Sequence, residues 1–325
     1  MLRFIQRTQT DPYYNLAAEE YFLKTTATDT FMIWMNDASV IVGKHQNALK
    51  EIDHSFVERH NLPVIRRITG GGTVYHDTGN INFSFIFTDR KENLIDFKEF
   101  TKPIILFLQS LGLNAAFEGK NNITVNGLKV SGNSAHLFKN KVLYHGTLLF
   151  SSDLDRLDSA ISGKEELYED RAVGSIRAKV ANISDLLNER IEKEQFIDLF
   201  KNFIINHIDN VYEENISIED DDNIRKLAEE KYRSYRWNFG YSPEYEFNNK
   251  WVYNNDEFSV RLLVKEGRVM KAEFNGPEEH SKALEHIAEL LTGSDHLRNS
   301  IRESFNLFSN ENDVPFLNQT LNHLF

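Results

Sequence analysis

Residues 66–80, RRITGGGTVYHDTGN, combine residue types that suit the binding of an anion. Three consecutive glycines, 70–72, would let backbone N–H groups converge on one point, because no Cβ atom stands in the way. Arg66 and Arg67 precede them and carry planar guanidinium groups that match a phosphate or a carboxylate. Neighbouring residues of a strand point to opposite faces, so we expect only one of the two arginines to face a ligand. On these residues alone, a bulged hairpin with surface arginines explains the stretch equally well.

This stretch does not match the common nucleotide-binding patterns. No Gly-Lys pair in it is followed by Ser or Thr, as a P-loop requires, and its glycines lack the dinucleotide-binding spacing. A nucleotide site here would therefore be of another type.

A second group of candidate residues lies in NNITVNGLKVSGNSA, residues 121–135. Asn126-Gly127 is typical of a two-residue hairpin turn, which places Lys129 just after the turn in a strand. A lysine beside a hairpin is by default a solvated surface charge. Lys129, however, lies between two apolar residues and is followed by Ser131-Gly132, where small residues would let a ligand come close. The segment YHGTLLF then places His145 on a strand of its own.

Composition limits the classes of protein that fit. The chain has 325 residues, of which 41% are hydrophobic and 26% charged, so we expect about two domains with a substantial core. A net charge of −12 argues against a nucleic-acid partner. The absence of cysteine excludes disulfides, thiolate metal sites and cysteine nucleophiles, and it fits a reducing cytosol.

The N-terminal segment MLRFIQRTQTDPYYN turns polar after five residues and so lacks the apolar core of a signal peptide. No apolar run reaches the length of a membrane span. We therefore expect a cytoplasmic protein with no membrane partner.

The first two-thirds of the chain alternate helical and strand-like patterns, which predicts one mixed α/β domain around a largely antiparallel sheet. Asp11 and Pro12 suit the start of a helix, and Gly112 suits the end of another. The predicted helices are 12–26, 53–62, 97–113, 193–208 and 220–235; the predicted strands are 30–34, 39–43, 63–68, 81–87 and 141–150, with a hairpin at 123–130.

A composition change near RWNFGYSPEYEF, residues 236–247, predicts a domain boundary. Beyond it, turn signals at Asn254-Asn255 and Glu266-Gly267 separate alternating strands. Two amphipathic helices are expected at 278–293 and 296–308. We predict a catalytic domain at 1–246 and a small α+β accessory domain at 247–325.

Several ordered motifs resemble those of the lipoate–protein ligase family. They are NLAAEEYFL, VIVGKHQNALKEID, RRITGGGTVYHDTGNINFSF, GLKVSGNSA, YHGTLLF and RAKVANI, followed by a tail similar to the accessory domain of the longer ligases. The resemblance implies an α+β fold shared with biotin ligases and octanoyltransferases. It also implies a two-step reaction, in which lipoate and ATP form lipoyl-AMP and pyrophosphate and the lipoyl group then passes to a carrier lysine.

The resemblance also implies roles for individual residues. Lys129 would contact both the lipoate carboxylate and the α-phosphate, where a fixed positive charge offsets the repulsion between two anions. The residues implied to hold the nucleotide, together with Lys129, are Arg67, Gly72, Thr73, Val74 and Tyr75. Those implied to line the lipoate pocket, of second rank, are Gly70, Gly71, His76, Asn80 and His145.

Mg²⁺ is expected because the leaving group is pyrophosphate, whose oxygens divalent ions bridge. The family often has Asn-Asp where this chain has Asn121-Asn122, and the acidic residue is thought to help hold the metal. The neutral amide of Asn122 predicts weaker metal binding or a different carboxylate ligand. Asp77 is a nearby acid, but we expect it to hold the loop.

The resemblance implies apo lipoyl-carrier partners, either a glycine-cleavage H protein or the E2 lipoyl domains of 2-oxoacid dehydrogenases. Two alternatives are considered. An ATP-independent octanoyl or lipoyl transferase would need a nucleophile, and the chain has no cysteine. A non-catalytic protein that binds lipoate or a lipoyl domain is supported only by Asn122, and Lys129 with the glycine loop argues against it.

Overall fold

The computed structural model describes residues 1–89, 95–176, 178–208, 210–308 and 314–325. Its chain divides into two compact units. The first unit comprises Met1–Lys44, Leu62–Ser159 and Ser175–Ser234, and the second comprises His45–Asn61, Ala160–Gly174 and Tyr235–Phe325. Two earlier segments, His45–Asn61 and Ala160–Gly174, thus belong to the same unit as the C-terminal residues. The division into domains at residues 246 and 247 stays a prediction.

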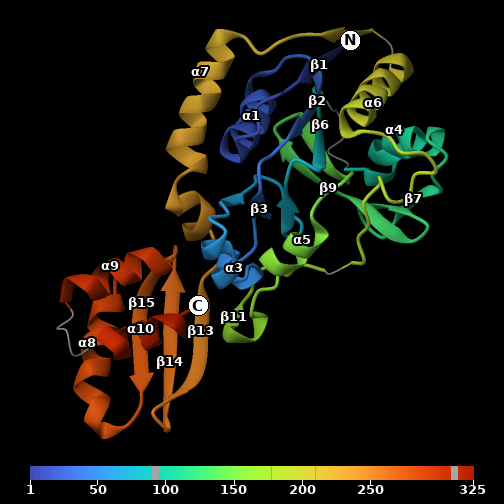
Figure 1. The fold of residues 1–325 in the computed structure, drawn as a ribbon. Helices are drawn as coiled ribbons and strands as arrows, with labels where there is room; N and C mark the ends of the chain where they lie inside the picture. Colours follow the sequence, from blue (N-terminus) through green and yellow to red (C-terminus); the bar gives the residue numbers. More distant parts are fainter. Residues whose placement is uncertain (90–94, 177, 209, 309–313) are drawn as a thin grey trace. The chain divides into compact units, whose positions relative to one another are not determined.

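The first unit is built on a mixed sheet (Figure 1). In the described residues this sheet has eight strands in the order β12-β1-β2-β6-β10-β9-β8-β7. The strands are β1 (Leu2–Gln6), β2 (Asp29–Met35), β6 (Asn80–Phe87), β7 (Ala115–Glu118), β8 (Asn122–Val125), β9 (Leu128–Phe138), β10 (Lys141–Leu149) and β12 (Val211–Glu213). Strand β1 pairs in parallel with β12 and β2, and the remaining neighbours are antiparallel. The predicted mixed, largely antiparallel sheet is therefore confirmed.

A smaller sheet of the same unit carries the glycine loop. It has the order β4-β3-β5, with β3 (Ser39–Val42), β4 (Val64–Arg66) and β5 (Val74–His76). Strand β3 pairs in parallel with β4 and antiparallel with β5. The strand predicted at 63–68 is shorter than expected, because the chain leaves the sheet after Arg66 to form the loop.

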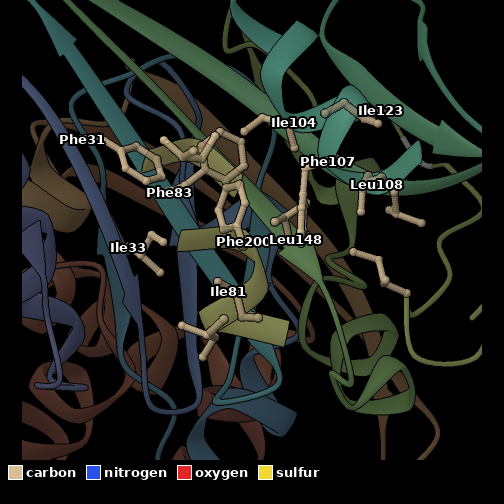
Figure 2. Packing of buried hydrophobic residues seen from close by; sticks show 14 of the residues in the cluster. Phe31, Ile33, Ile81, Phe83, Ile104, Phe107, Leu108, Ile123, Leu148 and Phe200 are labelled. Carbon is tan, nitrogen blue, oxygen red and sulfur yellow. The ribbon is translucent and has the colours of Figure 1, made fainter. Parts of the chain in front are cut away.

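The two faces of the large sheet differ in polarity because side chains alternate along each strand. On β6, Phe83 points into the apolar core (Figure 2). Its ring centroid lies 6.1 Å from that of Phe100 and 6.0 Å from that of Phe200. These two rings come from α4 (Phe97–Ser110) and α6 (Lys193–His207), which cover this face. Asn82 and Ser84 alternate with the phenylalanines and therefore belong to the opposite, polar face.

Helix α1 (Pro12–Thr25) packs against the polar face. The Asp11 side chain caps it by accepting a hydrogen bond from the Tyr13 amide, and Pro12 occupies the first turn, as predicted. The helix predicted at 220–235 is confirmed in part: α7 (Ile218–Leu227) is capped by Ser217 and gives way to a π-helical turn at Ala228–Tyr232.

The second unit contains a sheet in the order β11-β13-β14-β15. Its strands are β11 (Tyr168–Asp170), β13 (Tyr245–Tyr253), β14 (Asp256–Lys265) and β15 (Arg268–Asn275). The predicted turns are confirmed, with φ angles of 52° and 70° at Asn254 and Asn255, and 51° and 76° at Glu266 and Gly267. The helices are α2 (Ala48–Glu51), α3 (His54–Arg59), α8 (Ser281–Leu291), α9 (Arg298–Phe308) and α10 (Val314–Asn322). Helix α5 (Leu154–Ala160) ends where this unit resumes.

Within the described residues, every helix is too short or too polar to cross a lipid bilayer. Arg177, the first residue of the RAKVANI motif, lies outside the described residues.

Candidate active site

The side chain of Arg67 lies inside the glycine loop and holds it by hydrogen bonds. Its Nη2 donates to the carbonyl oxygens of Gly70 and Gly72, each at 2.7 Å. Its Nε donates to Oγ1 of Thr69 at 2.9 Å, and its Nη1 to the Ile41 carbonyl of β3 at 3.1 Å. A single buried guanidinium group therefore sets the shape of the loop and links it to the neighbouring strand.

Gly71 is the loop position that requires glycine. Its φ angle of 88° lies in the left-handed region, and a Cβ atom there would come within 3.1 Å of Nη2 of Arg67. Any other residue would strain the backbone and press on the guanidinium that holds the loop.

Two serines from other segments also contact the loop. Oγ of Ser134, on β9, donates to the Gly70 carbonyl at 2.9 Å. The Thr73 amide donates to Oγ of Ser175 at 2.9 Å. The loop is thus attached to the large sheet on one side and to the segment beginning at Ser175 on the other.

Lys129 lies near the start of β9, half-buried, with its ammonium group turned toward Gly132. A Cβ atom on Gly132 would lie 3.3 Å from both Cε and Nζ of Lys129, so a larger residue would crowd the amine. The Lys129 backbone pairs with the segment that follows Arg177, donating to Lys179 and accepting from Ala181. Burial, and then the positive charge of Arg67, lowers the pKa of Lys129 below its ordinary value. Two cations thus act on each other in a partly desolvated place, which favours an anionic ligand.

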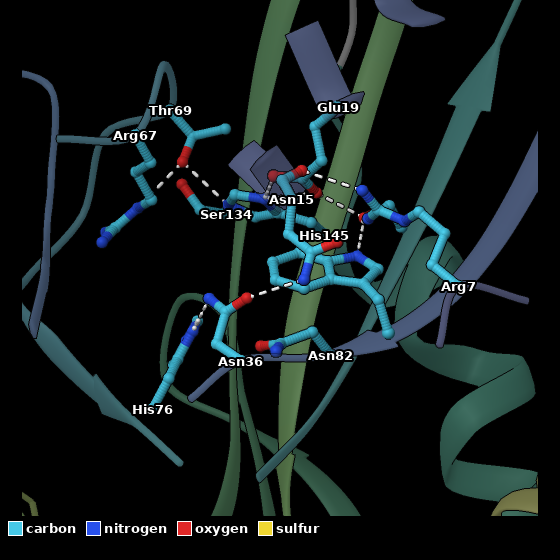
Figure 3. A network of polar contacts seen from close by, with 12 residues as sticks. Arg7, Asn15, Glu19, Asn36, Arg67, Thr69, His76, Asn82, Ser134 and His145 are labelled. Carbon is cyan, nitrogen blue, oxygen red and sulfur yellow. Dashed lines mark hydrogen bonds and ion pairs between the residues drawn. The ribbon is translucent and has the colours of Figure 1, made fainter. Parts of the chain in front are cut away.

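His145, on β10, connects the loop to helix α1 (Figure 3). Its Nδ1 lies 3.0 Å from Oε1 of Glu19, and its Nε2 lies 2.8 Å from Oγ1 of Thr69. Through Thr69 the imidazole contacts Arg67. The structure therefore brings two residues of the sequence prediction, Arg67 and His145, into one hydrogen-bonded chain.

His76 and Asn80 lie at the end of the loop, in a second polar group. Nδ2 of Asn36 donates to Nδ1 of His76 at 3.1 Å, and Nδ2 of Asn80 donates to Oδ1 of Asn82 at 2.9 Å. Burial, and then the charge of Arg67, lowers the pKa of His76 to about 3, so its ring is neutral at neutral pH. In the described part of the chain, Nε2 of His76, Oδ1 of Asn80 and Nδ2 of Asn82 are buried without a hydrogen-bond partner. Such groups are costly unless a ligand or water meets them.

The other predicted residues are buried around the loop. Arg66 is fully buried, and its Nη1 donates to the carbonyls of Gly43 and Lys44. Of the two arginines, only Arg67 contacts the glycine loop through the hydrogen bonds described. Thr73 and Tyr75 are buried and Val74 is half-buried in β5.

Asp77 holds the turn between β5 and β6 and fixes it to the segment at Asp153. Its two carboxylate oxygens accept hydrogen bonds from the backbone amides of Gly79 and Asp153, both at 2.8 Å. Asn122, at the start of β8, is half-buried and pairs across the sheet with Gly132. Among the described residues, the three-ligand group of His, Asp or Glu that could hold a metal is Asp256, Glu279 and His280, which belongs to the second unit.

Sequence reasoning missed residues that hold the site from a distance: Glu19, Asn36, Thr69, Ser134 and Ser175. For Glu19 the sequence contains only a weak indication of burial: it lies in NLAAEEYFL, among apolar residues of a predicted helix. The pair Glu19-Glu20 nevertheless reads as an exposed acidic pair, whereas both side chains are buried.

Comparison with known proteins agrees with this site. Residues 11–205 match the family described as the lipoyl protein ligase A/B catalytic domain. Lipoate–protein ligase 1 of Staphylococcus aureus is 40% identical over 278 residues, covering 85% of this chain and 84% of the relative. Lipoate-protein ligase LplJ of Bacillus subtilis is 36% identical over 297 residues, covering 90% of each. The chain belongs to the lipoyl protein ligase A/B family, and the predicted enzyme class, lipoate–protein ligase, is confirmed.

Solved structures share the fold. A lipoate-protein ligase A bound with ATP is 24% identical, with a TM-score of 0.62 over 74% of this chain and 98% of its own. A bi-partite ligase of Thermoplasma acidophilum, studied with its E2 lipoyl domain, is 23% identical, with a TM-score of 0.61 over 74% and 96%. The predicted α+β fold of the lipoate-ligase type is therefore confirmed.

Proposed function

We propose that this ligase works in two steps at the glycine loop. The lipoate carboxylate first attacks the α-phosphorus of ATP, which forms lipoyl-AMP and releases pyrophosphate. A lysine amine of an apo carrier then attacks the lipoyl carbonyl, which forms an amide and releases AMP. The observation that carries this proposal is the half-buried Lys129 amine, on which the charge of Arg67 acts in the same unit.

Lys129 is the proposed catalytic residue. Its lowered pKa reflects burial and repulsion from Arg67, and a bound carboxylate and phosphate would relieve both. Because its ammonium group is half-buried and turned toward Gly132, it can stabilise the charge that develops on the α-phosphate with little reorganisation of solvent. The same cation can then stabilise the oxyanion formed when the carrier lysine attacks.

The loop from Gly70 to Tyr75 is the proposed nucleotide-binding segment. Arg67 acts there in two ways, by holding the Gly70 and Gly72 carbonyls and by placing a positive charge behind the loop. The amide of Thr73, with those of Gly72, Val74 and Tyr75, would provide main-chain donors to the nucleotide. The carbonyls of Gly70 and Gly72 thus accept from Arg67, while the Thr73 amide donates to Oγ of Ser175, which a nucleotide would have to replace.

The polar group at His76 and Asn80 is the proposed boundary of the lipoate pocket, together with Gly71 and His145. The unpartnered Nε2–H of His76 and Oδ1 of Asn80 support this assignment, because a bound molecule or its ordered water would satisfy them.

Mg²⁺ bound with ATP fits the donor set as an ion held mainly by phosphate oxygens. The half-buried amide oxygen of Asn122 is the proposed protein ligand, since Mg²⁺ commonly takes one or two protein oxygens beside those of the phosphates. The ion would neutralise charge on the leaving pyrophosphate.

We further propose that the acceptors are apo lipoyl carriers, either a glycine-cleavage H protein or E2 lipoyl domains. The support is the Thermoplasma acidophilum ligase, a fold relative studied with its E2 lipoyl domain. An ATP-dependent reaction and a chain without cysteine both fit a cytoplasmic location.

The two steps can be tested separately. The first predicts lipoate-dependent exchange of labelled pyrophosphate into ATP in the presence of Mg²⁺, and the second predicts lipoylation of purified apo carriers. Lys129→Ala should abolish exchange while the folded protein keeps its melting temperature. Lipoate binding without exchange in the wild type would instead favour a non-catalytic binding protein.

A further inference from the structure

We propose that Glu19 is a positioning residue of this site: by orienting His145, it holds Thr69 and Arg67, and through Arg67 it holds the glycine loop. This inference rests on the proposed role of the loop in nucleotide binding. Glu19 itself contacts neither the loop nor, by this proposal, the reacting atoms.

Four side chains from separate parts of the chain form the connection (Figure 3). Glu19 comes from α1, His145 from β10, and Thr69 and Arg67 from the loop. The steps are 3.0 Å from Oε1 of Glu19 to Nδ1 of His145, 2.8 Å from Nε2 of His145 to Oγ1 of Thr69, and 2.9 Å from Oγ1 of Thr69 to Nε of Arg67. All four side chains are buried, so water does not compete readily for these hydrogen bonds.

The donors and acceptors of this chain fit one protonation pattern. Nε of Arg67 can only donate, so Oγ1 of Thr69 accepts from it. The Thr69 hydroxyl proton then goes to Nε2 of His145, its other partner. Oγ1 has a second lone pair that could accept from an Nε2–H, so we infer the pattern that also gives the hydroxyl proton an acceptor: Nε2 is unprotonated, and Nδ1–H donates to the Glu19 carboxylate. Glu19 thus selects the Nδ1–H tautomer of His145, the form that leaves an acceptor for Thr69.

The surroundings of Glu19 suit a permanently ionised acceptor. Burial would raise the pKa of Glu19, but His145, the Ser84 hydroxyl and the charge of Arg7 outweigh burial and hold it below its ordinary value. Ser84 donates to the same carboxylate and accepts from Nε1 of Trp34 at 3.1 Å. The Glu19 carboxylate therefore accepts hydrogen bonds from both Ser84 and His145. A residue that only filled space would not need these bonds.

Removal of Glu19 should change both the imidazole and the loop. In Glu19→Ala, Nδ1–H loses its acceptor, and His145 is expected to adopt the Nε2–H tautomer. The Thr69 hydroxyl proton then has no acceptor on His145, and the new Nε2–H competes with Nε of Arg67 for Oγ1 of Thr69, which weakens the hold on Arg67. A hydrogen bond to a charged group at such a position corresponds to about a tenfold to hundredfold change in affinity.

The neighbouring residue provides a matched control. Glu20 is also a buried glutamate of α1, but it contacts Lys24, Lys231 and Tyr232 and takes no part in the chain to the loop. Glu20→Gln should therefore leave both the His145 tautomer and the affinity for ATP unchanged.

The experiment records the tautomer of His145 by ¹⁵N–¹H correlation NMR and the dissociation constant of ATP by calorimetry, each on the full chain. We expect Glu19→Ala to switch the tautomer and to weaken ATP binding about tenfold to a hundredfold. Glu19→Gln, whose amide oxygen can still accept from Nδ1–H, should restore both. Thr69→Val should weaken ATP binding and keep the Nδ1–H tautomer. If Glu19→Ala does not fold, Thr69→Val still tests whether the chain of hydrogen bonds supports ATP binding.

Two outcomes would overturn the proposal: an unchanged tautomer in Glu19→Ala, or unchanged ATP affinity in Thr69→Val. Neither readout needs turnover. If wild-type protein binds ATP and shows the Nδ1–H tautomer but does not catalyse pyrophosphate exchange, the proposed function fails while this inference stands.

Discussion

The amide of Thr73 donates its hydrogen bond to Oγ of Ser175, 2.9 Å away. Thr73 belongs to the loop proposed to bind the nucleotide, so a neighbouring serine holds a donor that the nucleotide would use. Ser175 also lies close to Gly72, since a Cβ atom on that glycine would be 3.0 Å from its Oγ. At the proposed nucleotide site, ATP would therefore compete with Ser175 for the Thr73 amide.

We predict that Ser175→Ala strengthens ATP binding. A neutral hydrogen bond contributes about 0.5–1.5 kcal/mol net, so the dissociation constant should fall about twofold to tenfold. Ser134→Ala is the matched control with the opposite sign, because Oγ of Ser134 supports the loop through the Gly70 carbonyl. Calorimetric titration with ATP compares the two variants, and weaker binding in Ser175→Ala would show that Ser175 supports the bound state instead.

We predict that Gly71→Ala is far more damaging than Gly70→Ala. At Gly71 a left-handed φ of 88° costs an alanine about 1–2 kcal/mol, and the new methyl group would press on Nη2 of Arg67. At Gly70 a Cβ atom would meet nothing within 4 Å. Chemical denaturation should therefore show a loss of about 1–2 kcal/mol in unfolding free energy for Gly71→Ala, with loss of pyrophosphate exchange. Equal stability of the two variants would mean that the loop relaxes around Arg67.

We predict that the adenylation rate falls at alkaline pH, at a lower pH than a free lysine would require. Lys129 is charged below its pKa, and burial with the charge of Arg67 lowers that pKa from its ordinary value. As pH rises through the lowered pKa, the ammonium loses its proton and its attraction for the lipoate carboxylate. The measurement is kcat/KM for lipoate against pH in the exchange reaction. Lys129→Arg, whose guanidinium stays charged, should remove this inflection whatever its absolute rate.

Local sequence signals predicted the elements that depend on neighbouring residues. The hairpin at Asn126-Gly127 has φ angles of 51° and 80°, as such a turn requires, and the cap at Asp11 forms as expected. Pairings between distant segments carried no such signal. Strands β1 and β12 pair although some 200 residues separate them, and neither was predicted.

In the candidate site too, contacts between distant segments could not be predicted from the sequence. The guanidinium of Arg67 donates to the loop carbonyls, a geometry that depends on how the loop folds back. The expected contact of Arg67 with a nucleotide stays a prediction. Glu19 is buried only because Ser84 and His145, 65 and 126 residues away, are brought to it by the sheet. Motifs therefore located the loop and its lysine, but the side chains that hold them required three-dimensional contacts.

In the second unit, we predict that His296 makes the fold sensitive to acid. Its Nδ1 accepts from the Tyr245 hydroxyl at 2.7 Å, and its Nε2 donates to the Leu324 carbonyl at 2.8 Å. Burial lowers the pKa of His296 to about 4, against an ordinary value of 6.5. The folded unit therefore binds fewer protons than the unfolded chain between these two pH values. Protonation of His296 should therefore lower the free energy of unfolding by up to about 1.4 kcal/mol for each unit by which the pH falls within this window.

His54 contributes in the same direction, because burial and the charge of His296 lower its pKa to about 3. His296→Gln should therefore reduce the acid slope of stability between pH 6.5 and 4, but His54 should keep part of it. Urea denaturation at several pH values measures the slope, and His207→Gln on α6, where the side chain is exposed, controls for the substitution. If the slope in His296→Gln equals that of the wild type, protonation of His296 does not drive acid unfolding, and carboxylates elsewhere must account for it.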